Sequence, residues 1–145
     1  PISPSISTIS NAMDVGNPSN FPRMESIFNN DINQFRSSIK GCYFTDEETK
    51  DGIKELKDKF DYLACPHTAI AYLGLKKYST ENSGSIGVFL STAHFAKFLP
   101  DMEKVLGYTP QIPKRLSDLI GLEKSSTEIK ASYDEFKEYL LQNLI

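Results

Sequence analysis

Two periodicities of apolar residues alternate along the second half of this chain. A short apolar run at 86–90 lies between glycines and small polar residues, a pattern typical of a buried parallel strand covered on both faces. Apolar residues then recur at steps of one, three and four, which predicts an amphipathic helix ending at Gly107. The members of that helical face are Phe95, Phe98, Leu99, Met102, Val105 and Leu106.

A second apolar run, at 62–65, precedes Pro66, a residue suited to the first turn of a helix. The pattern predicts a strand near 62–65, a helix from Pro66 to about Lys77 and a strand near 85–91. Together these elements form a parallel βαβ unit, which should cross over with the right hand. The fold class predicted is α/β, rich in helices around an open sheet.

The remaining segments are predicted to be mainly helical. One helix should run from about Phe21 to about Asn29, and helical spacing continues weakly at 32–39. Thr45 precedes an acidic first turn and should cap a helix that reaches about Phe60. A short helix is expected at 114–119, and the capping-box spacing of Ser125 and Glu128 predicts a closing helix that includes Ile129.

Composition narrows the class of protein. The 145 residues, 39% of them apolar, suffice for one modest core, so a single domain or fragment over 1–145 is predicted. A net charge of −3 with mixed signs offers no basic stripe for nucleic acid, and no apolar run is long enough to span a membrane. Cys42 and Cys65 form no C-x-x-C pair, which favours free thiols in the cytoplasm and no metal site. The bare start, without Met, suggests part of a longer polypeptide.

Polar side chains follow both predicted strands. Ser91, Thr92, His94 and Lys97 come after the second strand, and His67 comes after the first. The carboxyl ends of parallel strands open on one edge of a sheet, where α/β proteins bind ligands. Each residue also has a structural alternative: Thr92 as a helix cap, His94 and His67 as turn histidines, and Lys97 as a solvated charge.

The loop at 14–20 is a further candidate. It is dense in Gly, Asn and Ser, and around Asn17 its backbone amides could face an anion. The alternative is a helix entry loop without a ligand.

Three stretches together resemble the carboxyl-terminal part of threonine synthase. They read AMDVGNPSNF at 12–21, PHTA at 66–69, and STAH at 91–94 followed by AKF at 96–98. The likeness extends from about Pro4 to the final helix. It implies a pyridoxal-phosphate enzyme of the tryptophan-synthase-like fold (fold type II). Such an enzyme is a carbon–oxygen lyase of threonine biosynthesis that converts O-phospho-L-homoserine and water to L-threonine and phosphate.

The resemblance also implies roles for individual residues. Thr92 matches the position whose hydroxyl meets the pyridine nitrogen of the cofactor, and Ser91 is the second candidate because strand alternation could aim either one inward. The family's Schiff-base lysine and Gly-rich phosphate loop lie upstream, so no catalytic residue is expected here. His94, Lys97, His67 and Asn17 are expected at the active-site rim.

It follows that this chain should complete the cofactor pocket of the intact enzyme and be inactive alone. Its expected partner is the remainder of a threonine synthase chain. Without it, the piece should not retain pyridoxal phosphate and should self-associate through exposed strand edges. The alternative is a non-catalytic interaction module derived from the same fold. Two departures from the family pattern leave room for a divergent member: Cys65 stands where the family usually has an acidic residue, and Phe95 where it usually has a proline.

Overall fold

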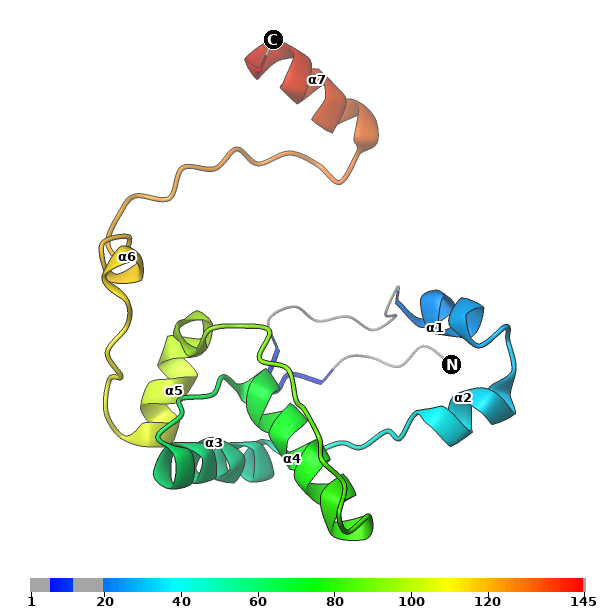
Figure 1. Ribbon diagram of the computed structural model, residues 1–145. Helices are drawn as coiled ribbons and strands as arrows, with labels where there is room; N and C mark the ends of the chain where they lie inside the picture. Colours follow the sequence, from blue (N-terminus) through cyan, green and yellow to red (C-terminus); the bar gives the residue numbers. More distant parts are fainter. Residues whose placement is uncertain (1–5, 12–19, 145) are drawn as a thin grey trace. The chain divides into compact units, whose positions relative to one another are not determined.

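The computed structural model describes residues 6–11 and 20–144 of the chain, and all statements of structure refer to these ranges. Contacts divide the chain into two units, Pro1–Gln111 and Ile112–Ile145 (Figure 1). The helices of the first unit are α1 Phe21–Ile27, α2 Ile32–Ser38, α3 Asp46–Phe60, α4 Pro66–Glu81, the 3-10 helix η1 Phe95–Phe98 and α5 Leu99–Leu106. The second unit contains α6 Lys114–Ser117 and α7 Tyr133–Asn143.

Helix α3 begins and ends as the sequence predicts. The Thr45 hydroxyl accepts from the backbone N–H of Glu48, whose carboxylate accepts from the Thr45 N–H, so a complete capping box starts the helix. Asp61 ends it in the left-handed conformation, with φ 49°. The buried positions of α3 include Thr49, Gly52, Ile53 and Leu56.

Helices α3 and α4 pack closely because glycine stands at their contact. A Cβ atom at Gly52 would lie 3.0 Å from Leu73 Cδ1, so the missing side chain lets α4 approach. Helix α5 also packs on α3 and ends at Gly107, whose φ of 76° is left-handed. The core of the described residues consists of Ile53, Leu56, Ala64, Cys65, Ala69, Phe95, Phe98, Met102 and Val105. The helical face predicted from Phe95 to Val105 is therefore confirmed.

Helices α1 and α2 form at their predicted places and bury no residue of their own. Asp31 caps α2 by accepting from the backbone N–H groups of Asn33 and Gln34. Phe35 contacts Phe28 edge to face, with ring centroids 5.3 Å apart. The two helices are therefore joined by a small aromatic cluster.

The predicted βαβ unit is not confirmed, since no strand is assigned within the described ranges. The segments 62–65 and 85–91 are irregular, and the expected burial of the second run is wrong for this chain: Ile86 is 99% exposed, Val88 84% and Leu90 72%. The physical reason is that no described segment pairs with 85–91. A strand requires a neighbour for its backbone N–H and C=O groups, and the described chain supplies none beside 85–91.

The closing helix of the second unit starts later than predicted. Helix α7 begins at Tyr133 with Ser132 as its N-cap, so Ser125 caps no helix and Ile129 lies in an irregular segment. The Glu135 carboxylate accepts from the Lys130 N–H at 2.8 Å, which ties this segment to the first turn of α7. A capping-box spacing alone therefore gave the wrong start.

Glu55 pairs with Lys59 within α3 and with Lys76 of α4, and these ion pairs generate a pH dependence. Lys59 and Lys76 both donate to this carboxylate, each at 2.7 Å at its shortest, and lower its pKa from 4.5 to about 2. A depressed carboxyl pKa stabilises the fold above pH 4.5, and this contribution is lost as the pH falls toward 2. Urea unfolding of Glu55→Gln should show a lower free energy of unfolding at pH 7 and no difference from the parent near pH 2. Glu128→Gln, at an exposed position outside the described ion pairs, is the control, and equal losses in both variants would contradict this role.

Candidate functional site

A hollow of about 470 Å³ lies where the extended segment 85–91 ends and η1 begins. Its wall combines hydroxyl, imidazole and apolar groups from two parts of the first unit. The lining residues are Tyr62, Leu63, Ser91, Thr92, Ala93, His94 and Phe95. Its volume falls in the range of small-molecule sites, about 300–1,000 Å³.

Four polar side chains connect the two turns beside this hollow. The Thr68 hydroxyl donates to Ser91 Oγ at 3.1 Å, and the Tyr62 hydroxyl donates to the same oxygen at 3.0 Å. Cys65 Sγ lies 3.2 Å from Thr68 Oγ1. Thr68 is 1% exposed, so its hydroxyl is satisfied only by protein groups. The turn that follows 62–65 and the turn that follows 85–91 thus meet.

The segment 85–91 runs back along α4 in a regular register. A Cβ atom at Gly87 would meet the Leu75 side chain, and the Phe89 ring contacts the Tyr72 ring edge to face at 5.8 Å. Ser91 then meets Thr68. The odd-numbered residues of the segment therefore face one side of α4. Ile86, Val88 and Leu90 alternate with them and are exposed.

Thr92 lines the hollow and is exposed. Within residues 6–11 and 20–144, its hydroxyl has no hydrogen-bond partner. The alternative in which Thr92 caps a helix is wrong, because His94 occupies the N-cap of η1 and its Nδ1 accepts from the Ala96 N–H at 3.2 Å. The Thr92 hydroxyl is therefore available to a ligand.

The side chains of His94 and Phe95 contact each other in this turn. Their rings are 4.3 Å apart at 32°, and Phe95 is 8% exposed. The capping bond of His94 uses Nδ1, and the residue is exposed. Phe95 is thus part of the core.

His67 and Lys97 both lie near the Phe98 ring. The His67 ring is 5.2 Å from the Phe98 ring, and Lys97 Nζ is 5.9 Å from the centre of that ring. Partial burial and, to a smaller extent, the positive charge of Lys97 lower the pKa of His67 below 6.5. The histidine and the lysine are therefore electrostatically coupled, but neither is among the residues that line the hollow.

The hydroxyls of Tyr62 and Thr68 were not predicted as site groups. Thr68 is three residues after Cys65, the N-cap of α4, which is the spacing that Thr45 and Glu48 show in α3. A thiol is a weak acceptor, and Cys65 makes no capping bond to the backbone. The position of Thr68 three residues after the N-cap was the one sequence feature that could have indicated its contact with Cys65. Asn17 lies outside the described residues.

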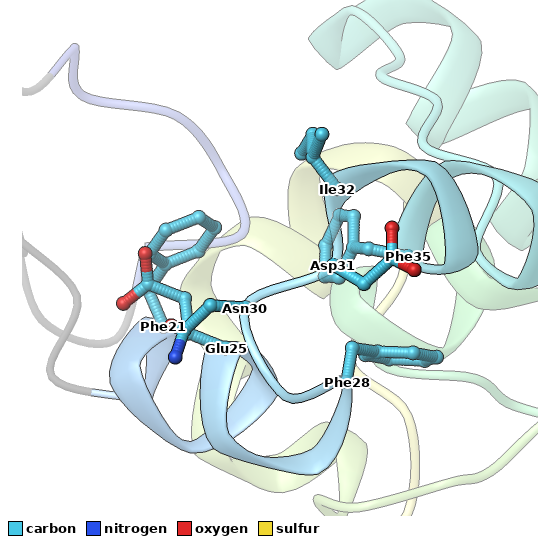
Figure 2. Close-up of a pocket in the computed structure, with 7 residues that line it drawn as sticks. All are labelled: Phe21, Glu25, Phe28, Asn30, Asp31, Ile32 and Phe35. Carbon is cyan, nitrogen blue, oxygen red and sulfur yellow. The ribbon is translucent and has the colours of Figure 1, made fainter.

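A second, more enclosed pocket lies between α1 and α2 and has a volume of about 130 Å³ (Figure 2). Its lining shares no residue with the predicted site and consists of Phe21, Glu25, Phe28, Asn30, Asp31, Ile32 and Phe35. Figure 2 shows Phe21 and Glu25 on one helix and Ile32 and Phe35 on the other. The pocket between α1 and α2 is smaller than the hollow at Ser91–Phe95, and it contains none of the polar side chains predicted for the site. The hollow is therefore the stronger candidate.

Other site types find no support in the part of the chain that the structure describes. No group of three His, Cys, Asp or Glu side chains there could hold a metal ion. Both cysteines are free, Cys42 exposed and Cys65 buried. None of the described helices has the length and apolar character needed to cross a membrane.

Comparison with known proteins identifies the family. The family model described as "Threonine synthase, C-terminal" matches residues 68–140, about half of the chain, including the turn at Ser91–His94. The chain belongs to the threonine synthase family. It is 38% identical to threonine synthase of Serratia marcescens over 136 residues, and 36% identical to that of Escherichia coli K12 over 136 residues.

Solved structures agree with this membership. The crystal structure of threonine synthase from Escherichia coli superposes with a TM-score of 0.78 at 36% identity and matches 97% of this chain. A PLP-bound threonine synthase from Brucella melitensis gives a TM-score of 0.66 at 26% identity, again over 97% of the chain. The chain spans about 31% of the length of its Serratia marcescens relative and 32% of the Escherichia coli structure.

The pKa of His67 provides a test of the geometry around Phe98. NMR titration of the imidazole should give a value below 6.5, and Lys97→Gln should raise it without restoring it fully, because burial is the larger cause. A lowered histidine pKa means that stability is fully present above the unfolded pKa and is lost as the pH falls from that value through the lower folded pKa. Lys77→Gln, an exposed lysine on α4, is the control. If neither lysine substitution moves the titration, Lys97 does not lie near the ring.

Proposed function

We propose that this chain is the carboxyl-terminal part of a threonine synthase and completes the cofactor pocket of the intact enzyme. That enzyme converts O-phospho-L-homoserine and water to L-threonine and phosphate. The observation that carries the proposal is the hollow at Ser91–Phe95, whose exposed Thr92 hydroxyl lies inside the matched region. The PLP-bound relative from Brucella melitensis supports pyridoxal phosphate as the cofactor.

Thr92 is the residue proposed to meet the cofactor. A hydroxyl can donate to an unprotonated pyridine nitrogen, whereas a carboxylate would hold that nitrogen protonated. Ser91, the second candidate, also lines the hollow, but its oxygen already accepts from Thr68 of α4 and from Tyr62. The alternation of side chains along 85–92 therefore favours Thr92 as the donor.

The residues present fit one edge of the cofactor. The hollow offers a hydroxyl donor without a described partner, aromatic and apolar walls, and no lysine among its lining residues. When bound, pyridoxal phosphate supplies the electron sink of the reaction, and the protein tunes and orients it. The contribution of this chain is then to orient the ring through Thr92 and to form part of the wall that excludes water. His94, Lys97, His67 and Asn17 stay proposed residues of the active-site rim.

The remainder of the threonine synthase chain is the proposed partner. The exposed side chains Ile86, Val88 and Leu90 form an apolar stripe on a segment whose odd-numbered residues pack on α4. A neighbouring strand would satisfy the backbone of 85–91, and a covering element would bury this stripe. Without that partner, the same segment is the proposed site of self-association. The cytoplasmic location inferred from the two free thiols stays a prediction.

Removing the Thr92 hydroxyl should weaken cofactor binding. In the full-length protein that carries this chain, Thr92→Val should raise the dissociation constant of pyridoxal phosphate roughly fivefold, since one hydrogen bond contributes about 1 kcal/mol net. It should also shift the absorption band of the bound cofactor. Thr92→Ser keeps the hydroxyl and should restore both values. An unchanged dissociation constant in Thr92→Val would refute the proposed contact.

The chain alone should be inactive. One donor at the ring nitrogen leaves the cofactor phosphate and aldehyde unbound, so purified residues 1–145 should release no phosphate from O-phosphohomoserine in the presence of pyridoxal phosphate. The full-length protein, assayed in parallel, should release it. Turnover by the chain alone would show that no essential part is missing. A full-length protein that binds no cofactor would instead favour a non-catalytic interaction module.

A further inference from the structure

The hydrogen bonds among Cys65, Thr68, Tyr62 and Ser91 all donate toward Ser91. Thr68 and Tyr62 both donate to Ser91 Oγ, so the two acceptor positions of that oxygen are filled. Because Thr68 uses its proton on Ser91, the remaining partner of its oxygen is the thiol of Cys65, which then donates at 3.2 Å. The described residues contain no buried side-chain nitrogen or oxygen without a partner, so this relay is complete.

The relay fixes the backbone at the point where Thr92 begins. Its buried end is rigid, because Cys65 and Thr68 are each 1% exposed and lie in the first turn of α4 and its cap. Its other end is Ser91, the last residue of 85–91 that contacts α4. Thr92 follows directly, and no described hydrogen bond of its own holds its side chain. The orientation of Thr92 is therefore set through Ser91.

The bond from Tyr62 is a second constraint on the Ser91 side chain, in addition to the bond from Thr68. Tyr62 precedes α4, whereas Thr68 lies within it, so Ser91 is held from two separate positions. Two donors from different directions define the location of one oxygen more closely than a single bond. Beyond Ser91, His94 fixes the start of η1 through its bond to the Ala96 N–H. Only residues 92 and 93 separate these two anchored positions.

We propose that Thr68 and Tyr62 are positioning residues that act through Ser91 to aim the Thr92 hydroxyl at the cofactor. This inference rests on the proposed function and adds the residues that determine the geometry of its donor. Neither Thr68 nor Tyr62 contacts the cofactor in this account. Their loss should therefore change how well the Thr92 donor is oriented, while the donor itself stays in place.

The test compares two buried threonines in the full-length protein. Thr68→Val removes a hydroxyl that belongs to the relay. Thr49→Val removes a hydroxyl that is also 1% exposed and donates to the Thr45 carbonyl at 2.8 Å, within α3. Thr68→Val loses the hydrogen bonds of its hydroxyl to Ser91 and Cys65, and Thr49→Val loses one, so both variants should lower the melting temperature. Tyr62→Phe changes a partly exposed side chain and keeps the proposal testable if Thr68→Val does not fold.

The readout is the dissociation constant of pyridoxal phosphate, followed by absorbance. Thr68→Val should raise the dissociation constant by at most the roughly fivefold expected for Thr92→Val. Tyr62→Phe should raise it less. Thr68→Ser should restore binding, and Thr49→Val should leave it unchanged. In the double variant Thr68→Val with Thr92→Val, the losses should not add, because both act on one donor.

Three results would overturn the proposal. Normal cofactor binding in both Thr68→Val and Tyr62→Phe, with weakened binding in Thr92→Val, would leave the proposed function intact and remove the relay. Equal losses in Thr68→Val and Thr49→Val would show that the threonine at 68 acts only through stability. Normal binding in Thr92→Val would refute the proposed function, and the relay with it.

Discussion

The alignment of the extended segment 85–91 with α4 is the constraint on which the site depends. Gly87 lies against Leu75, Phe89 against Tyr72, and Ser91 against Thr68, so every second residue of the segment is held by the helix. This register brings the turn at 91–94 to the amino-terminal end of α4. It also leaves the other face of the segment exposed. The same contacts thus place the hollow beside α4 and leave Ile86, Val88 and Leu90 exposed.

The helices were largely predictable because their signals are local. The capping box at Thr45, the proline at 66 and the glycine at 107 each specify a helix end through the backbone of a few neighbouring residues. The start of α7 was not predictable in this way, since Ser125 and Glu128 have the right spacing without forming a helix. The two predicted strands are not assigned in the described residues, because strand pairing depends on distant partners that an apolar run does not specify.

The site was predicted in part. The sequence placed Thr92 and Ser91 after an apolar run but could not decide which side chain faces the helix, because that depends on register. The hydrogen bonds of Ser91 to Thr68 and Tyr62 make that distinction in the structure. These partners are 23 and 29 positions away along the chain, and neither residue type signals such a contact.

We propose that 85–91 is a strand of a larger sheet, with α4 on one face, a covering element of the remaining chain on the other face, and a neighbouring strand at its edge. Amide hydrogen exchange, measured residue by residue at 86–92, tests this most directly. The account predicts fast exchange in the isolated chain and protection increased by about a hundredfold or more in the full-length protein. Equal exchange rates in the two proteins would contradict it, since the segment would then have no partner to gain.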